Sequence, residues 1–131
     1  AFLNVDFSGK DLNGADFENC KFYHCTFDNA SLVNCNLQNA LFSNCSLYNV
    51  TAEEAELQNA RFFSCNLAKA FFTHSNFKEA VLKSCQTTSS SFMNCCIENI
   101  ALEETDLPND KMFDSELDWI KNDIPDFEPN M

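Results

Sequence analysis

The hydrophobic positions of the chain recur every five residues, not with the period of a helix or a strand. From Lys21 to Val50 the chain divides into six five-residue blocks, each with Phe or Leu second and Ala, Cys or Val fifth; five of them have Asn fourth. A helix repeats its buried face about every 3.6 residues and a strand every second residue. The five-residue period therefore predicts a chain that turns a corner every five residues, with one large and one small side chain pointing inward on each side.

Residue types also recur every twenty residues, so that Phe and Cys each return to the same place four times. Four sides of five residues then make one coil, and equivalent residues of successive coils stack ~4.8 Å apart. Residues 1–107 are thus predicted to form an all-β, four-sided parallel β-helix of about five coils. The inward columns of this β-helix are the expected core ladders: Phe2, Phe22, Phe42 and Phe62, and Cys25, Cys45, Cys65 and Cys85.

After Leu107 the five-residue register fails, and apolar residues recur at helical spacing. This pattern predicts a helix from about residue 110 to residue 123, started by Asn109 or Asp110 and stopped by Pro125. Residues 108–131 are therefore interpreted as a C-terminal capping helix and tail, in which the tail 126–131 is expected to be loose. The apolar side of the helix, with Ile124 at its end, is expected to cover the open end of the rod through five further residues: Met112, Phe113, Leu117, Trp119 and Ile120.

Two blocks, Ala-Asp-Phe-Glu-Asn at residues 15–19 and Ala-Phe-Phe-Thr-His at residues 70–74, carry a family resemblance. Over about residues 1–107 the chain resembles the pentapeptide-repeat family, whose shorthand is A(D/N)LxX. The resemblance implies a right-handed, quadrilateral β-helix. It does not fix a function, because the family includes modules that dock other proteins and also mimics of duplex DNA that bind type II topoisomerases.

The net charge of −12 is concentrated at the C-terminal end, where eleven acids and two lysines from Glu98 onward contribute −9. The repeat body is only mildly acidic and has no basic stripe, so direct nucleic-acid binding is not expected. No apolar run reaches the ~18 residues of a membrane span. Because the chain begins at Ala1 already in register with the repeat, we interpret it as part of a longer protein.

Seven of the eight cysteines occupy the small inward position, where Ala otherwise stands. Buried free Cys behaves as a small hydrophobe, so structural thiols are the favoured interpretation, and disulfides and metal binding are weaker alternatives. Cys96 falls at an outward position and is predicted to be the most reactive thiol. A ladder of reduced cysteines is typical of a reducing compartment, which favours the cytoplasm and leaves a secreted bacterial effector as the alternative.

No catalytic constellation emerges from the repeat. His24 and His74 are two and a half coils apart and are expected on opposite sides of the rod, as solvated corner residues. Glu53, Glu54 and Glu56 are interpreted as a solvated charged corner. No Ser/His/Asp or paired-carboxylate set converges, so neither an enzyme nor a metal or cofactor site is predicted.

The feature that points to a function is a line of outward apolar residues along one side of the rod. Lys21 and Arg61 lie among them, and aligned exposed apolar groups often mark an interface. We therefore predict a non-enzymatic protein–protein interaction or scaffold module, whose partner is another protein, a missing neighbouring domain or a second copy of the chain. The alternative is a DNA mimic that binds gyrase, although residues 1–97 carry a net charge of only −3. The candidate partner face consists of Leu3, Tyr23, Leu41, Phe63 and Val81.

Overall fold

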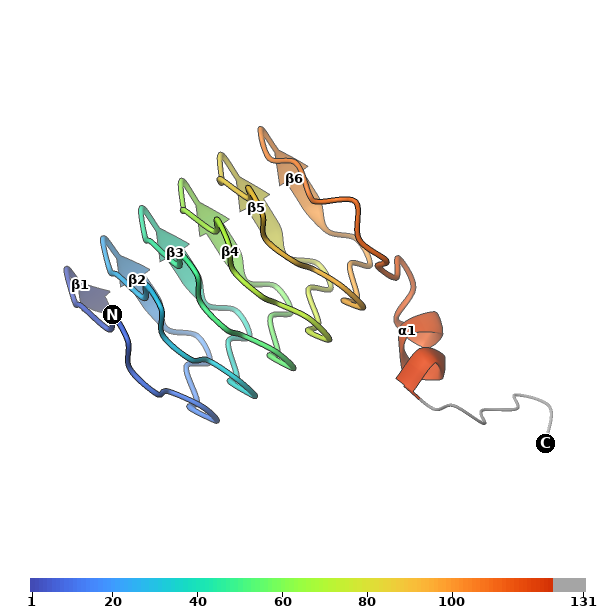
Figure 1. Ribbon diagram of the computed structural model, residues 1–131, viewed down its shortest axis with the longest axis horizontal. Coiled ribbons are helices and arrows are strands. Elements are labelled where there is room, and N and C mark those ends of the chain that lie inside the picture. The colour runs from blue at the N-terminus through green and yellow to red at the C-terminus, as the bar shows by residue number, and fades with distance from the viewer. Residues whose placement is uncertain (124–131) are drawn as a thin grey trace.

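The computed structural model describes residues 1–123, which form a right-handed, four-sided parallel β-helix followed by one short helix (Figure 1). Successive strands pair in parallel and in chain order, with Phe22 opposite Phe42 and Phe42 opposite Phe62. Ile124, Pro125 and the tail 126–131 lie outside the described residues. One side of the rod is a six-stranded sheet made of β1 (Phe2–Leu3), β2 (Lys21–Tyr23), β3 (Leu41–Ser43), β4 (Arg61–Phe63), β5 (Val81–Lys83) and β6 (Ala101–Glu103).

The corners explain why Asn recurs at the fourth place of the blocks. The fourth residue of every five-residue block, from Asn4 to Glu104, has a positive φ, between 47° and 74°. This left-handed conformation costs an ordinary L-residue roughly 1–2 kcal/mol, whereas Gly and Asn adopt it readily. The chain can therefore turn by about a quarter of a coil after each block, and the main chain pairs with the coils above and below.

The large inward residues form the core of the rod. The side chains of Phe22, Phe42 and Phe62 are fully buried, as is Leu82 in the next coil. The ring centroids of Phe22 and Phe42 are 4.9 Å apart, and those of Phe42 and Phe62 are 4.7 Å apart, with nearly parallel planes. Phe2, in the first coil, is only partly buried. The ring spacing therefore follows the coil spacing, so that each side chain in a ladder rests on its equivalent in the next coil.

Coil pairing continues beyond the predicted boundary at Leu107. The amide of Asn94 donates to the carbonyl of Lys111 at 2.6 Å, and the amide of Ile97 donates to the carbonyl of Phe113 at 2.7 Å. The residues after Leu107 thus add part of a sixth coil, although their side chains no longer follow the five-residue pattern.

The C-terminal helix starts later than the sequence predicted. Helix α1 spans Glu116–Asp123, and neither expected cap begins it. The carboxylate of Asp110 instead accepts a hydrogen bond from the amide of Phe92 at 2.6 Å, which holds it in the sixth coil. Ser115 caps the helix, because its Oγ accepts a hydrogen bond from the amide of Asp118 at 3.4 Å. The helical prediction from residue 110 was therefore wrong by about six residues.

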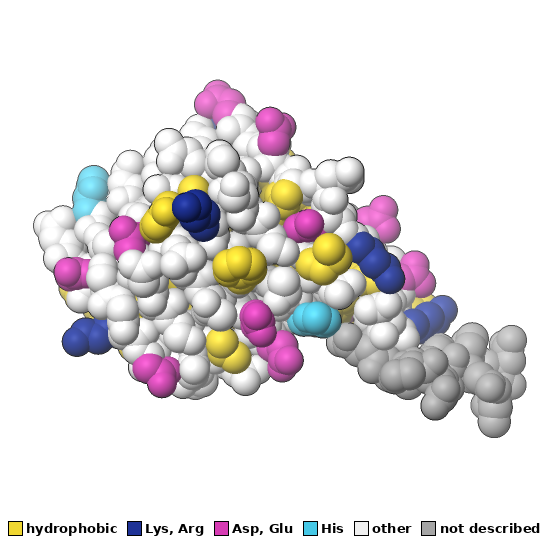
Figure 2. Space-filling view, in the orientation of Figure 1, with side chains coloured by type: hydrophobic (Ala, Val, Ile, Leu, Met, Phe, Trp, Pro, Cys, Tyr) yellow, Lys and Arg dark blue, Asp and Glu magenta, His cyan; other side chains and the backbone are white. Residues whose placement is uncertain are grey.

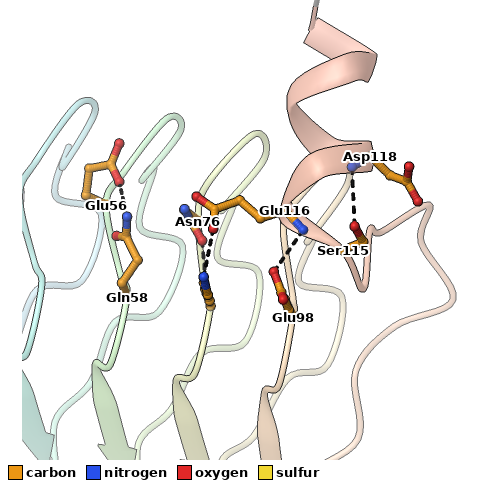
Figure 3. Close-up of polar contacts among 8 residues, drawn as sticks. Glu56, Gln58, Asn76, Glu98, Ser115, Glu116 and Asp118 are labelled. Atoms are coloured by element: carbon orange, nitrogen blue, oxygen red, sulfur yellow. Dashed lines mark hydrogen bonds and ion pairs between the residues drawn. The ribbon is translucent and has the colours of Figure 1, made fainter. Parts of the chain in front are cut away.

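Polar contacts fasten the start of α1 to the rod. Glu98 accepts a hydrogen bond from the amide of Glu116 at 2.9 Å, which satisfies one of the free donors of the first turn (Figure 3). The Glu116 carboxylate also pairs with Lys78 Nζ at 2.9 Å. In the same region Trp119 Nε1 donates to the carbonyl of Asn94 at 2.7 Å. Helix α1 is thus anchored beside the last coil.

The helix does not cover the end of the rod as expected. The side chains of Leu117 and Ile120 are 58% and 44% exposed, and Leu102 of the last sheet layer is 40% exposed. Met112, which precedes the helix, packs against the core cluster. The expected capping role is therefore wrong for Leu117 and Ile120, because α1 is too short and lies beside the last coil (Figure 1).

Candidate binding surface

The sheet side, which we define as the outward surface of β1 to β6, carries the predicted apolar line. Leu3 is 65% exposed, and Tyr23, Phe63 and Val81 are partly exposed. Leu41 differs from the expectation, since only 9% of it is exposed. In the register of the sheet Leu41 lies between two long side chains, Lys21 and Arg61, whose aliphatic stems can cover it. The partner face is thus an apolar line interrupted by two cations.

The charge of the sheet side has one sign over most of its length. Within the first five coils this side carries Lys21, Arg61 and Lys83 and no acidic residue, and acids appear only in the sixth coil, at Glu103 and Glu104. Lys83 Nζ lies 3.6 Å from the Glu103 carboxylate in an exposed pair, which contributes little to stability. Lys83 is not among the residues of the predicted partner face, but its place in the twenty-residue coil, opposite Phe63, puts it on the sheet side.

The thiol ladder, which consists of Cys25, Cys45, Cys65 and Cys85, lies beneath a groove along one edge of the sheet side. The groove encloses about 600 Å³ and is rimmed by His24, Asn44 and other small polar residues. Each thiol donates to a main-chain carbonyl 23 residues earlier, at 3.2 to 3.5 Å. These regular contacts stack the four sulfur atoms in a column along the rod and are consistent with free, structural thiols.

Stacking of the thiols perturbs their acidity. The polar contact with the stacked Cys65 thiol is the main cause that lowers the pKa of Cys45, to about 7, and that of Cys85. The pKa of Cys65 itself is raised, because its stacked neighbours Cys45 and Cys85 and its burial favour the protonated form. Burial also raises the pKa of Cys95, to about 12. The lowered pKa values therefore belong to two thiols of the stacked ladder, Cys45 and Cys85, whereas burial raises the pKa of Cys35 outside it.

Cys96 is not the accessible thiol that its outward position predicted. Its side chain is fully buried, and burial raises its pKa. The reason is that the C-terminal segment covers its side of the rod, with Phe113 forming a parallel bridge to Cys96. The prediction failed because the five-residue pattern does not reveal what packs onto the outside of the last full coil.

The two histidines lie at different corners of the rod and do not share a site. His24 rims the thiol groove, and His74 lines a smaller cleft of about 390 Å³ with Glu54, Glu56 and Trp119. No cluster of three or more His, Cys, Asp or Glu side chains among residues 1–123 is placed to hold a metal ion.

No helix within residues 1–123 is long and apolar enough to cross a membrane.

Two family models match the chain. The model of the pentapeptide repeat region matches residues 1–72, and the model of the SV2A/B/C luminal domain matches residues 44–121. Comparison with curated protein sequences finds no significant match.

Several solved structures are similar to the chain. A pentapeptide repeat protein from the Arabidopsis thaliana thylakoid lumen is 23% identical, with 75% of this chain and 72% of that chain covered and a TM-score of 0.39. A trypsin-treated variant of QnrB1, a plasmid-mediated fluoroquinolone resistance protein, is 18% identical, with 94% and 85% covered and a TM-score of 0.41. The pentapeptide repeat protein Rfr23 from the cyanobacterium Cyanothece 51142 is 16% identical, with 80% and 88% covered and a TM-score of 0.26. Since the pentapeptide repeat model covers more than half of the sequence, the chain belongs to the pentapeptide repeat family.

Proposed function

We propose that the protein is a non-enzymatic interaction module that binds other protein surfaces through the sheet side. The observation that carries this proposal is the line of exposed apolar residues, chiefly Leu3, Tyr23 and Phe63, on a flat sheet whose first five coils bear cations and no acids. Soluble monomers rarely leave apolar groups aligned on one surface without an interaction to bury them. Aromatic residues and Arg are also the residue types that contribute most often to binding hot spots.

The size of the sheet side sets the strength of the contact. Five coils about 4.8 Å apart, each about five residues wide at ~3.3 Å per residue, give a surface of about 400 Å². A standard stable interface buries about 800 Å² on each partner. The sheet side alone therefore supports a weak or transient contact, and tight binding would require a partner that also reaches a second side.

The proposal is tested with the protein as bait in its native cell extract. The double substitution Tyr23→Asp with Phe63→Asp introduces two charges into the apolar line and should abolish the recovery of specifically bound proteins. Both side chains point outward from the sheet, so the circular dichroism spectrum should remain that of the unmodified protein.

A matched control places the same two charges on the neighbouring side of the rod. Gln86→Asp with Thr88→Asp changes exposed residues of the fifth coil by the same chemistry. Recovery of the same proteins by the control bait, together with their loss from the sheet-side bait, supports the proposal. Equal recovery by both variants would mean that the sheet side is not the binding surface.

The alternative function, mimicry of DNA toward gyrase, draws on outward acids of the other sides, such as Asp16, Glu18 and Glu56. Mimicry depends on the potential of a whole surface, and the cations of the sheet side weaken it. An assay of gyrase supercoiling in the presence of the protein tests it directly. Inhibition of supercoiling, or its protection from a quinolone, that is lost on reversal of these three charges would favour this alternative over the interaction module.

A further inference from the structure

We infer that the sheet side of one copy packs against the opposite side of a second copy, so that rods associate laterally. This inference rests on the proposed function and names the partner as the chain itself. The opposite side is defined as the outward surface of residues 11–15, 31–35, 51–55, 71–75 and 91–95, two corners away from the sheet side.

The two sides carry complementary charge. The first five coils of the sheet side hold three cations and no acid, as described above. The opposite side holds Asp11, Glu53 and Glu54 and neither Lys nor Arg. Within the first five coils the rod therefore carries a net charge of +3 on one side and −3 on the other. Complementary charges on two surfaces favour their encounter and fix their relative position.

The charges also share one axial spacing. Lys21 and Arg61 lie in the second and fourth coils, which are two coils, or about 10 Å, apart. Asp11 lies in the first coil and Glu53 and Glu54 in the third, which are again two coils apart. A neighbouring rod displaced by one coil, about 4.8 Å along the axis, brings both sets of charges into register. The charge match covers the second and fourth coils of the sheet side, whereas Lys83 in the fifth coil meets a coil of the neighbour that holds no acid on its opposite side.

The opposite side also offers apolar surface. Phe71 is 45% exposed and Met93 is 38% exposed, and Val33 is partly exposed in an earlier coil. Figure 2 shows hydrophobic and acidic side chains close together, with some Lys or Arg side chains, on the surface of the rod that faces the viewer. With the one-coil displacement, the coil of Phe71 meets the coil of Val81 in the next rod. In the first five coils each side thus combines apolar groups with charges of one sign, and the sign on one side is opposite to that on the other.

The contact joins two different surfaces, so it is heterologous and can be repeated by each added copy. The product is an open row of rods instead of a closed dimer. The area of about 400 Å² on each copy is half that of a standard interface, so the association is weak and depends on protein concentration. The high net negative charge of each copy opposes it further, which also keeps the rows short.

Sedimentation velocity of the full chain, from about 10 µM to about 1 mM in physiological salt, measures this association. The weight-average mass should rise with concentration. The variant Lys21→Glu with Arg61→Glu reverses the two cations of the sheet side, and Asp11→Lys with Glu53→Lys reverses the two acids of the opposite side that share their axial spacing. Each double variant should lower the association constant at least about tenfold, because it places like charges across the contact.

The decisive variant combines all four substitutions. It restores opposite charges across the contact and keeps the net charge of the unmodified protein, so association should return. Two controls match the net charges of the double variants on other sides: Lys10→Glu with Lys69→Glu, and Glu56→Lys with Glu79→Lys. These controls should associate as the unmodified protein does, or change only slightly through the altered net charge.

Two outcomes would overturn the inference. One is a constant monomer mass over the whole concentration range. The other is an association that the double variants leave unchanged or that the four-fold variant fails to restore. Failure of this inference is distinguishable from failure of the proposed function. If the protein stays monomeric but Tyr23→Asp with Phe63→Asp still abolishes the recovery of bound proteins, the sheet side binds another partner.

Discussion

Replacing Phe42 with Ala removes a ring from the middle of the longest aromatic stack. Phe42 is fully buried, its ring lies 4.9 Å from that of Phe22 and 4.7 Å from that of Phe62, and it also meets Phe27 edge-on at 5.7 Å. Buried Phe→Ala substitutions cost about 3–5 kcal/mol, through lost transfer free energy and the cavity left behind. The main-chain pairing of the third coil with both neighbours prevents the coils from closing the cavity, so we expect about 4 kcal/mol.

Thermal and urea unfolding followed by circular dichroism measure this loss of stability. For a domain of this size, 1 kcal/mol shifts the midpoint by roughly 3–5 °C, so Phe42→Ala should lower Tm by about 12–20 °C. Phe71→Ala is the matched control, because it removes the same ring from a site that is 45% exposed. The control should cost less than about 1 kcal/mol. If the two substitutions lowered stability equally, the inward placement of the Phe ladder would be refuted.

Three further predictions follow from the corners, the thiols and the C-terminal segment. Glu79→Asn should raise the free energy of unfolding by roughly 0.5–1 kcal/mol, because Glu79 has a φ of 60° that Asn adopts more readily. Asn59→Ala, at the equivalent corner one coil earlier, should lower the free energy of unfolding by a similar amount. Urea unfolding measures both changes. The pKa of the Cys95 thiol is about 9 in the unfolded chain and about 12 in the folded protein, so its contribution to stability is complete below pH 9 and is lost as the pH rises from 9 to 12. Between pH 8 and pH 10 the Cys95→Ala variant should therefore lose about 1.4 kcal/mol less stability than the unmodified protein. An unchanged pH dependence would contradict the assigned burial. Truncation after Asp110 should expose Cys96, so that native-state alkylation detected by mass spectrometry modifies Cys96 rapidly in the truncated protein and slowly in the full chain; rapid modification in both would show that residues 111–123 do not cover it.

The fold of the repeat body was predictable because the place of a residue in its block sets its side-chain direction and its backbone conformation. Phe42 must point inward at the second place of its block, and Asn44 must accept a positive φ at the fourth. Both requirements return every five residues, and the twenty-residue recurrence of Phe and Cys sets the number of sides. The local five-residue and twenty-residue periods are therefore enough to predict the fold of residues 1–107, without knowledge of any tertiary contact.

The C-terminal end was less predictable because tertiary contacts decide it. Helical spacing after Leu107 suggested an early start. The Asp110 carboxylate instead accepts a hydrogen bond from the amide of Phe92, Phe113 pairs through its main chain with the fifth coil, and Ser115 caps the helix. The same pairing buries Cys96, whose outward position indicated exposure. A periodic pattern specifies which way a side chain points, but it does not specify which later segment will cover it.

The candidate surface was predicted in part. The outward direction of Leu3, Tyr23 and Phe63 follows from the repeat, whereas the near-complete covering of Leu41 depends on its cross-strand neighbours. The uniform charge of the sheet side was present in the sequence, but it becomes visible only when residues are sorted by their place in the coil. The identity of a partner cannot be read from the pattern, because the family shares a fold and not a binding site.

The most direct test of the four-sided coil is a set of nuclear Overhauser contacts between main-chain protons in solution. The four-sided coil predicts contacts between residues twenty apart on every side, such as Leu41 with Arg61 and Thr51 with Phe71. Contacts at another constant separation, or the three-residue contacts of a helix across residues 1–107, would contradict the stacking on which the sheet side and its proposed interactions depend.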